Sequence, residues 1–243
     1  MCYTISYAEQ RAARISERYK KLFPTTLISN LPEQLTAYYL VSGFSHPELP
    51  IVTQNGLILG EWGLIPKWIK DENAASDIRK MTLNAVGESA FEKPSFKHSM
   101  TTQRCLLPVN GFYEWRDFNG IKYPYFIQLK NLESFSLGCI YADWMNPITH
   151  QKKTTFSILT TPANSLMEKI HNLKKRMPLI IHPENEERWI SPTLNNDEIN
   201  NLILPYEAQE MRAYTISMTA NAAKNDRNNP EILNPVGYPE LQE

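Results

Sequence analysis

The sequence predicts a single α+β domain built on a largely antiparallel β-sheet. Strand-like segments follow one another through turn signals along most of the chain, and the few helical segments lie between them. The 243 residues contain no repeat, no low-complexity segment and no convincing linker, which favours one domain over 1–243. The last stretch, 222–243, is polar and rich in turn residues, so we expect a C-terminal extension there.

The first expected elements are a short strand in "CYTIS" (2–6) and a helix over 8–23 that stops at Pro24. Apolar side chains recur at helical spacing at Ala8, Ala12, Ile15, Tyr19 and Leu22. Another face of the same helix carries Arg11, Arg14, Arg18 and Lys21. A basic stripe of this kind either meets phosphates or is a solvated helix face.

Three hairpins are expected next. Asn55-Gly56 separates two apolar runs in "LPIVTQNGLILGEWGLI", which is a strong hairpin signal. A turn over 117–120 separates "RCLLPVNGFYEWR" from "KYPYFIQL", and "SFSLGCIYADWM" precedes "TTFSILTTP" as a third pair. "MPLII" and "AYTISMTA" are expected as late strands.

Short helices are expected around 165–171, 184–189 and 197–202. Ser165 followed by Glu168 fits a capping box at the start of the first of them.

The composition is that of an ordinary globular protein. Hydrophobic residues make up 42% and charged residues 21%, and the formal net charge is −1. Any contact with nucleic acid must therefore come from a local basic patch. No apolar stretch is long enough to span a membrane and the N-terminus lacks a secretory signal, so we expect a cytoplasmic protein.

Cysteine usage points away from disulfides and metal. Cys2, Cys105 and Cys139 are an odd, sparse set, which argues against a disulfide framework. No paired Cys/His spacing suggests zinc, and no metal or cofactor is expected. Cys105 and Cys139 lie in apolar strand segments and are expected in the core.

Cys2 could carry unusual chemistry. A small side chain at position 2 permits removal of Met1, which leaves an amine and a thiol on adjacent carbons of one residue. The α-amine has a pKa of about 8, so a useful fraction is neutral and nucleophilic near neutral pH. It can condense with an aldehyde to a Schiff base, and the thiol can then close a thiazolidine ring. The alternative is an accidental cysteine at a ragged terminus.

Three further stretches contain candidate functional residues. In "GFYEW" Glu114 shares a strand face with Phe112, opposite Tyr113 and Trp115, so apolar neighbours would raise its pKa; the alternative is a solvent-facing glutamate. In "EKIHNLKKRMPLII" the helix end would favour protonated His171, a general acid, and a cationic cluster of Lys174, Lys175 and Arg176 follows. In "TLNAVGESAFEKPSF" Asn84 could orient an amine or a backbone group.

Taken together, these stretches resemble the SRAP family, the SOS response-associated peptidases. The resemblance rests on Cys2, "WGLIPKW", "LNAVGES" with "FEKPSF", "RCLLPVNGFYEW", "PYFIQL", "TTPAN" and "IHNLKKRMPLII", in this order. It implies a barrel-like sheet with peripheral helices and a monomer, nucleoid-associated when bound to DNA. The implied activity is sensing of abasic sites in single-stranded DNA, with a covalent thiazolidine cross-link through Cys2 after Met1 removal. It also implies a cysteine peptidase (hydrolase) activity that removes the residue before the cysteine, and an abasic-site lyase activity.

The resemblance also implies roles for individual residues. Cys2 is the nucleophile, Asn84 positions it and the sugar, Glu114 lies near the amine, and His171 helps to open the deoxyribose ring. The implied DNA-binding residues are Arg176, Lys174, Lys175, Trp62, Pro66 and Trp68.

Two positions depart from the family pattern. Val86 stands where the family often has an arginine, so that one phosphate contact is either lost or supplied elsewhere. Four residues, 172–175, separate His171 from Arg176, where the family often has one.

Two other functions fit the same residues. In an N-terminal-nucleophile amidohydrolase, Cys2 would attack an amide with its own amine as the base. In a non-covalent module for single-stranded DNA, Cys2 would be incidental, and binding would be reversible and sensitive to salt.

Overall fold

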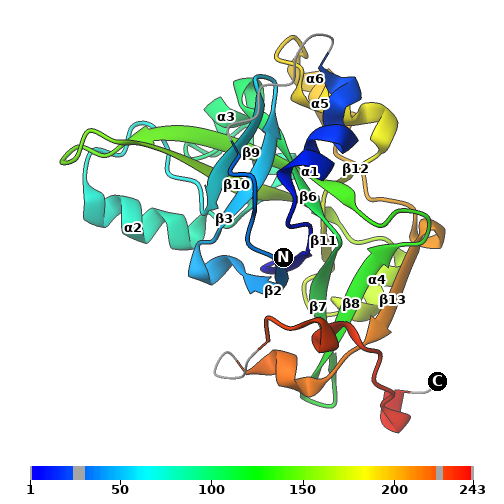
Figure 1. The fold of residues 1–243 in the computed structure, drawn as a ribbon. Coiled ribbons are helices and arrows are strands. Elements are labelled where there is room, and N and C mark those ends of the chain that lie inside the picture. Colours follow the sequence, from blue (N-terminus) through cyan, green and yellow to red (C-terminus); the bar gives the residue numbers. More distant parts are fainter. Residues whose placement is uncertain (1, 24–30, 223–226, 242–243) are drawn as a thin grey trace.

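A computed structural model of the protein describes residues 2–23, 31–222 and 227–241. Two β-sheets share one hydrophobic core, and the helices lie around them (Figure 1). None of the helices in these ranges is long and apolar enough to cross a membrane. The described part is therefore the α+β fold with peripheral helices that the sequence predicts.

A closed five-stranded barrel forms the centre of the larger sheet. Its strands pair in the ring β10-β4-β3-β6-β9, and pairing of β9 with β10 closes it. The bounds are β3 Glu48–Thr53, β4 Gly56–Trp62, β6 Arg104–Val109, β9 Phe135–Met145 and β10 Lys152–Pro162. Three short strands extend this sheet, namely β5 Asn84–Val86, β11 Arg176–Pro178 and β12 Ile180–Ile181. Only the pairs β10–β4 and β10–β5 are parallel among the described strands, so the expected antiparallel, barrel-like sheet is confirmed.

The second sheet holds the N-terminal strand in its interior. Its order is β13-β8-β7-β1-β2, and all its neighbours are antiparallel. The bounds are β1 Thr4–Tyr7, β2 Tyr38–Ser42, β7 Gly111–Phe118, β8 Ile121–Leu129 and β13 Met211–Thr215. The chain therefore begins next to a strand that has partners on both sides.

The three hairpins predicted from the sequence are confirmed. The pairs β3–β4, β7–β8 and β9–β10 each join strands that are consecutive along the chain. Their turns follow the residues expected: Asn55 precedes β4, and Asn119-Gly120 separates β7 from β8. Both Asn119 and Gly120 have positive φ, which these two residue types tolerate best.

Six α-helices lie in the described ranges, and the sequence predicted them less well than it predicted the hairpins. Their bounds are α1 Ala12–Tyr19, α2 Glu72–Met81, α3 Lys97–Thr102, α4 Ser165–Ile170, α5 Glu186–Ile190 and α6 Asn196–Asn200. The first begins at Ala12 rather than at 8, because residues 8–11 instead bond to residues 33–35 and to Asn110. The capping box at Ser165 is wrong, because Asn164 is the N-cap and accepts the Met167 N–H. The sequence did not predict α2 because only Ala75 in it is buried.

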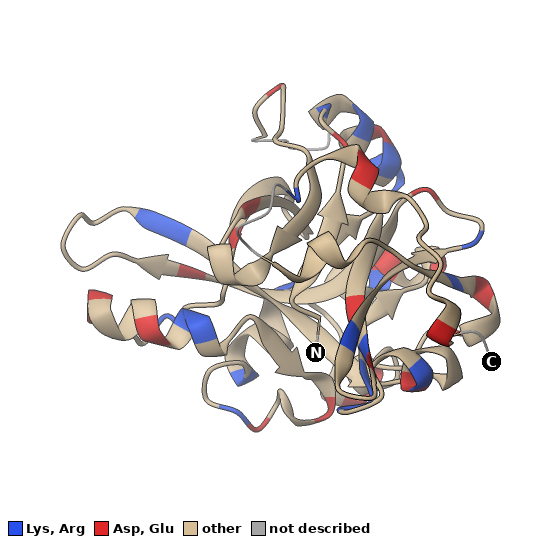
Figure 2. Cartoon of the chain, turned by 90° about the horizontal axis from the view of Figure 1, so that it is seen from below, with Lys and Arg blue, Asp and Glu red and all other residues tan. Residues whose placement is uncertain are grey.

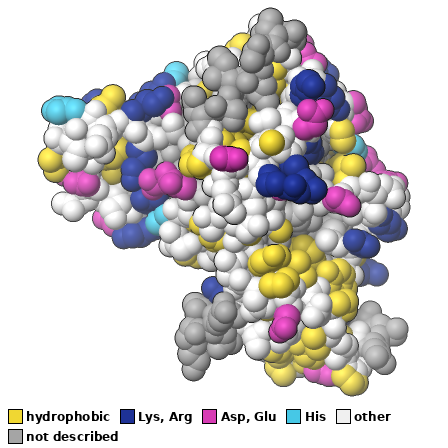
Figure 3. All heavy atoms as spheres, in the orientation of Figure 1, with side chains coloured by type: hydrophobic (Ala, Val, Ile, Leu, Met, Phe, Trp, Pro, Cys, Tyr) yellow, Lys and Arg dark blue, Asp and Glu magenta, His cyan; other side chains and the backbone are white. Residues whose placement is uncertain are grey.

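The described part of the C-terminal extension, 227–241, packs on the outer face of the second sheet. Ile232 is buried in a small cluster with Leu40, Tyr113, Phe126 and Ile216. The Val236 N–H donates to the Thr215 carbonyl of β13 at 2.9 Å. Hydrophobic side chains gather in the same lower part of the molecule (Figure 3).

Gly111 is a sharp test of how closely β7 packs against β8. It pairs with Ser6 of β1, and an added Cβ would lie 2.4 Å from the Phe126 ring and 2.6 Å from the Ile127 carbonyl oxygen. We expect Gly111→Ala to lower the free energy of unfolding by about 1–3 kcal/mol or more, measured by urea titration. Gly237→Ala, where an added Cβ meets nothing within 4 Å, should change it by less than about 0.5 kcal/mol. Equal effects of the two substitutions would contradict this packing.

Candidate active site around Cys2

Cys2 is buried at the start of β1. Its side chain has no exposed surface, and its Sγ lies 3.7 Å from the Thr4 carbonyl oxygen. The strand that follows is held on both sides, because Ile5 pairs with Phe112 of β7 and with Val41 of β2. The Tyr3 carbonyl accepts the Gly43 N–H at 2.8 Å, which extends this pairing almost to Cys2. The Cys2 side chain is therefore not exposed at a ragged end.

Glu114 lies on the inner face of β7. Alternation along the strand places Phe112 in the main core, whereas Tyr113 and Trp115 pack in the outer cluster, as the sequence predicts. Glu114 is 4% exposed, and burial raises the pKa of its carboxyl to about 8. The expected upward shift of this pKa is confirmed, and a solvent-facing glutamate is excluded.

His171 lies directly after α4 and faces Glu114. Its Nε2 is 3.9 Å from Glu114 Oε2, and its Nδ1 is 2.7 Å from the Arg176 carbonyl oxygen. The expectation that the helix end favours the protonated imidazole is wrong. Burial disfavours the charged ring and lowers the pKa of His171, and α4 has only 6 residues with which to oppose that.

The side chains of Cys2, Glu114 and His171 are therefore mostly uncharged near neutral pH. The Glu114 carboxyl is mostly protonated and the His171 imidazole mostly neutral. Burial, reinforced by the nearby Glu114 carboxylate when it is ionised, raises the pKa of the Cys2 thiol well above its usual value. A reaction of the thiol thus needs a proton acceptor, and the neutral His171 imidazole, which lies beside Glu114, is the candidate for it.

Asn84 lies on β5, next to the barrel strand β10. It pairs with Ile158, which pairs with Cys139, so the three residues share one face of the sheet. The negative charge of an ionised Cys139 would act on the Cys2 thiol, which places Cys139 near Cys2. Within the described part of the chain neither polar atom of the Asn84 amide has a hydrogen-bond partner, although both are buried. A buried amide of this kind is available to a ligand.

Arg176 is bound within the protein. Its guanidinium contacts both carboxylate oxygens of Glu88, at 2.6 and 2.8 Å, and donates to the Thr160 carbonyl at 2.6 Å. The side chain of Arg176 is 18% exposed and that of Glu88 43%. A phosphate at Arg176 would therefore compete with the Glu88 carboxylate. Val86, where a second arginine is missing, is exposed beside this pair.

The other residues expected at a DNA surface separate into two groups. Trp62 and Pro66 are buried, and the Trp62 indole donates to the Leu83 carbonyl, so Trp62 is a core residue rather than part of a surface. Trp68 is 54% exposed, and Lys174 and Lys175 are also exposed. Figure 2 shows that basic and acidic residues are mixed over the molecule rather than separated into two faces.

Three residues near the site were not selected from the sequence. Tyr3 lies close enough to Cys2 and Glu114 that their charges, after burial, raise the pKa of its phenol. Glu88 binds Arg176, and the side chain of Asn172 binds the backbone of Asp117. Adjacency to Cys2 and His171 was the only available signal for Tyr3 and Asn172.

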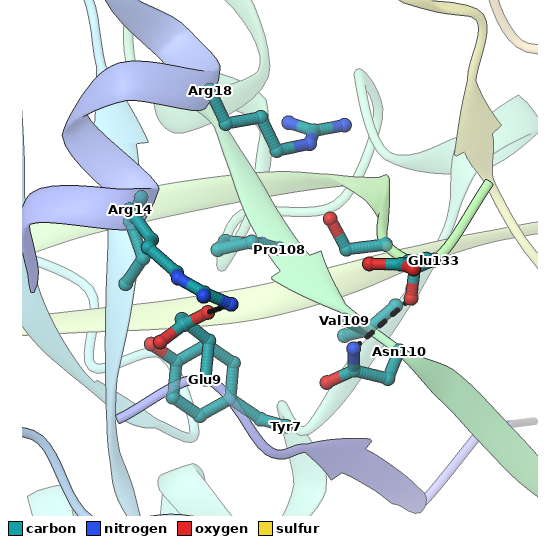
Figure 4. A pocket seen from close by; sticks show the side chains of 10 residues that line it. Tyr7, Glu9, Arg14, Arg18, Pro108, Val109, Asn110 and Glu133 are labelled. Carbon is teal, nitrogen blue, oxygen red and sulfur yellow. Dashed lines mark hydrogen bonds and ion pairs between the residues drawn. The ribbon is translucent and has the colours of Figure 1, made fainter. Parts of the chain in front are cut away.

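A separate hollow lies beneath α1 (Figure 4). Arg14 and Arg18, from the basic stripe of the first helix, form one of its walls. Arg14 pairs with Glu9 at 3.6 Å, and Arg18 pairs with the buried Glu186 at 2.8 Å. These arginines are neutralised within the fold, so the hollow is a weaker candidate than the Cys2 site.

Among the described residues no group of three or more His, Cys, Asp or Glu side chains could hold a metal ion.

Most of the chain is similar to known proteins. The family model for "SOS response associated peptidase (SRAP)" matches residues 1–223. "Abasic site processing protein YoqW" of Bacillus subtilis is 35% identical over 209 residues, which cover 80% of this chain and 89% of that protein. "Abasic site processing protein YoaM" of the same organism is 38% identical over 71% of this chain and 72% of its own length. A crystal structure of a Bacteroides thetaiotaomicron protein superposes with a TM-score of 0.89 at 38% identity, covering 97% of this chain and 100% of that one.

Burial of Glu114 has a measurable effect on stability. Between pH 4.5 and about 8 the folded protein keeps a proton on Glu114 that the unfolded chain has released, so this group's contribution to stability is lost as the pH rises through that window. Each unit of pKa difference corresponds to about 1.4 kcal/mol. We expect Glu114→Gln to gain stability relative to the parent by several kcal/mol between about pH 5 and pH 8.5, measured by urea unfolding.

Glu187→Gln is the matched control, because Glu187 is exposed on α5. Its stability relative to the parent should not change over this pH range. If the stability difference between Glu114→Gln and the parent is also independent of pH, Glu114 is solvated in the folded protein.

Proposed function

The chain belongs to the SRAP family, and on this premise we propose that it processes abasic sites in single-stranded DNA by forming a covalent link through Cys2. Two observations support the proposal. The similar Bacillus proteins are named for abasic-site processing, and Cys2 is buried beside a carboxyl and an imidazole whose pKa values suit proton transfer. The proposal depends most on one observation: His171 Nε2 lies 3.9 Å from Glu114 Oε2, and Glu114 lies near the Cys2 thiol.

The proposed chemistry is a condensation without oxidation or reduction. After Met1 is removed, the neutral amine of Cys2 attacks the aldehyde carbon of the ring-opened sugar and forms a carbinolamine. Loss of water gives an imine. The thiol then adds across the C=N bond: the S–C bond forms, the sulfur proton is transferred, and the nitrogen gains a proton. The products are a five-membered thiazolidine and one water molecule.

Glu114 and His171 supply the proton transfers. A carboxyl with a pKa of about 8 is still protonated near neutral pH, so it can donate to the departing hydroxyl of the carbinolamine. The neutral imidazole can accept the thiol proton, which burial holds on the sulfur. Before the amine attacks, the protonated fraction of His171 donates to the ring oxygen as the sugar ring opens. Transfers of this kind contribute roughly 10²–10⁴ in rate each.

The peptidase activity is assigned to self-processing. Removal of the residue before Cys2 frees the amine that the cross-link requires, so the two activities belong to one site. An abasic-site lyase activity follows from the same imine, since a Schiff base makes the neighbouring C–H acidic and permits elimination of the phosphate.

DNA is held by few groups. The unpartnered Asn84 amide is placed to bond the sugar, and exposed Trp68 offers a face on which a base can stack. Arg176 binds a phosphate when that phosphate displaces Glu88. Lys174 and Lys175 add exposed positive charge next to His171.

Denaturing gel electrophoresis tests the covalent link. We expect the processed protein, mixed with a single-stranded oligonucleotide that contains one abasic site, to give a product of reduced mobility that survives denaturation. Cys2→Ala should abolish it, whereas Cys105→Ala, at a buried cysteine of β6, should retain it. His171→Ala and Glu114→Ala should slow its formation about 10²-fold.

Other outcomes identify the rival functions. Intact mass must first show that Met1 is absent, because its retention blocks the amine. Ammonia or peptide release from an amide substrate would indicate an amidohydrolase. Reversible, salt-sensitive binding that survives Cys2→Ala, with no adduct from the parent, would indicate a binding module.

Displacement of Glu88 gives a second, independent prediction. In the Cys2→Ala background, where binding is reversible, Glu88→Gln leaves Arg176 without its internal carboxylate. We expect tighter binding to the abasic oligonucleotide, because the phosphate no longer has to displace a carboxylate from Arg176. Glu187→Gln changes net charge equally and should bind about as tightly as the background protein. Equal affinities of the two variants would show that Arg176 meets no phosphate.

A further inference from the structure

Asn172 joins the segment after α4 to the β7–β8 hairpin. Its Nδ2 donates to the Asp117 carbonyl oxygen at 2.8 Å, and its Oδ1 accepts the Asp117 N–H at 3.1 Å. One side-chain amide thus satisfies both backbone polar groups of a single strand residue. The edge of β7 is open there, because β1 pairs with β7 only at Gly111 and Phe112.

The strand held in this way is the one that carries Glu114. Asp117 follows Glu114 by three residues, and the intervening stretch is paired with β8 from Glu114 to Asp117. Asp117 is itself fixed, since its carboxylate accepts the Gly120 N–H at 3.1 Å and pairs with Lys122 at 2.8 Å. The Asn172 amide is therefore bonded to a rigid part of the hairpin.

The backbone of Asn172 belongs to the segment that carries His171. The Lys175 N–H donates to the His171 carbonyl at 2.9 Å, and Lys175 has a left-handed backbone with φ of 48°. The Lys175 carbonyl accepts the Ala163 N–H, and His171 Nδ1 lies 2.7 Å from the Arg176 carbonyl. The segment 171–176 is thus a closed loop, and Asn172 is the side chain in it that bonds to β7.

We propose that Asn172 is a positioning residue, which holds His171 against Glu114 by binding the backbone of Asp117. The expected effect of Asn172 on covalent capture rests on the proposed function, whereas its effect on the position of His171 does not. The same two hydrogen bonds restrain the long connection between His171 and Arg176. Four intervening residues leave a loop more freedom than one does, and the two hydrogen bonds of Asn172 remove that freedom on the side that faces Glu114.

The same anchor controls the surroundings of the imidazole. The charged groups that act on His171 are Glu114 from β7, Lys122 from β8, Lys174 from the loop, and the N-terminal amine of the chain. Burial is the main cause of its low pKa, and the nearby positive charges add to it. A loop released from Asp117 would give the ring more water and move Lys174 away. Both changes raise the pKa of His171.

The test uses the full chain with Asn172→Ala, and Leu173→Ala as the matched control. Leu173 is the next residue of the loop and is 68% exposed. The first readout is titration of the His171 imidazole by NMR, assigned with His171→Ala, which needs no DNA. We expect Asn172→Ala to raise this pKa toward its ordinary value and Leu173→Ala to leave it unchanged. Amide hydrogen exchange at Asp117 should also become faster in Asn172→Ala only.

The second readout separates positioning from DNA contact. With the abasic oligonucleotide, we expect Asn172→Ala to slow covalent capture about 10-fold or more, because small displacements of a catalytic group are costly. Its affinity for an undamaged oligonucleotide of the same sequence should stay within about two-fold of the parent.

Three results would overturn the inference or redirect it. An unchanged His171 pKa with unchanged exchange at Asp117 would refute it whether or not the parent forms an adduct. A loss of affinity for undamaged DNA equal to the loss of rate would make Asn172 a DNA contact instead. Absence of any adduct from the parent would refute the proposed function, while the NMR titration would still decide the positioning role.

Discussion

The pairing of β1 with β2 and β7 is the constraint on which the site depends. The first residues of a chain are usually poorly ordered, because few contacts offset the entropy lost when they are fixed. Here Ile5 has a partner on each side, and the Tyr3 carbonyl bonds to Gly43. A flexible terminus could visit many places, but a strand in the interior of a sheet brings Cys2 to one. Since β7 also carries Glu114, the strand that orders the cysteine supplies its neighbouring acid.

Burial sets the chemistry and has a cost. A carboxylate at Glu114 and an imidazolium at His171 would be more favourable in water. Removal from water favours the neutral form of each, so it raises the pKa of Glu114 and lowers the pKa of His171. The closed barrel and the shared core provide the stability that offsets this cost. An apolar residue at position 114 would suit the core better, and the glutamate there fits the proton transfer that is proposed for it.

Local signals in the sequence predicted the strands and much of the site, and failed where long-range contacts decide. Asn55-Gly56 and the alternation around Glu114 act between neighbours, so the hairpins and the inward carboxyl were foreseen. The direction of the His171 pKa was not, because it depends on how deeply the ring is covered rather than on its place at a helix end. Trp62 looked like a surface residue within its motif, but its indole is bonded inside the core to Leu83. No local pattern could show that Arg176 would meet Glu88, 88 residues away.

The loop that contains His171 also carries much of the exposed positive charge near the site. Arg176 is held by Glu88, and Val86 adds no charge beside it, so the barrel side of the site has little positive charge to offer a phosphate. Lys174 and Lys175 are exposed on the loop itself, although Lys175 lies 3.9 Å from the Glu168 carboxylate. Lys122, on the hairpin to which Asn172 binds, is paired with Asp117. In a protein with a net charge of −1, attraction of DNA must come from such local groups. On the proposal that Asn172 positions His171, the loop that carries the imidazole also carries this exposed positive charge, and it is bonded to the strand that pairs with β1.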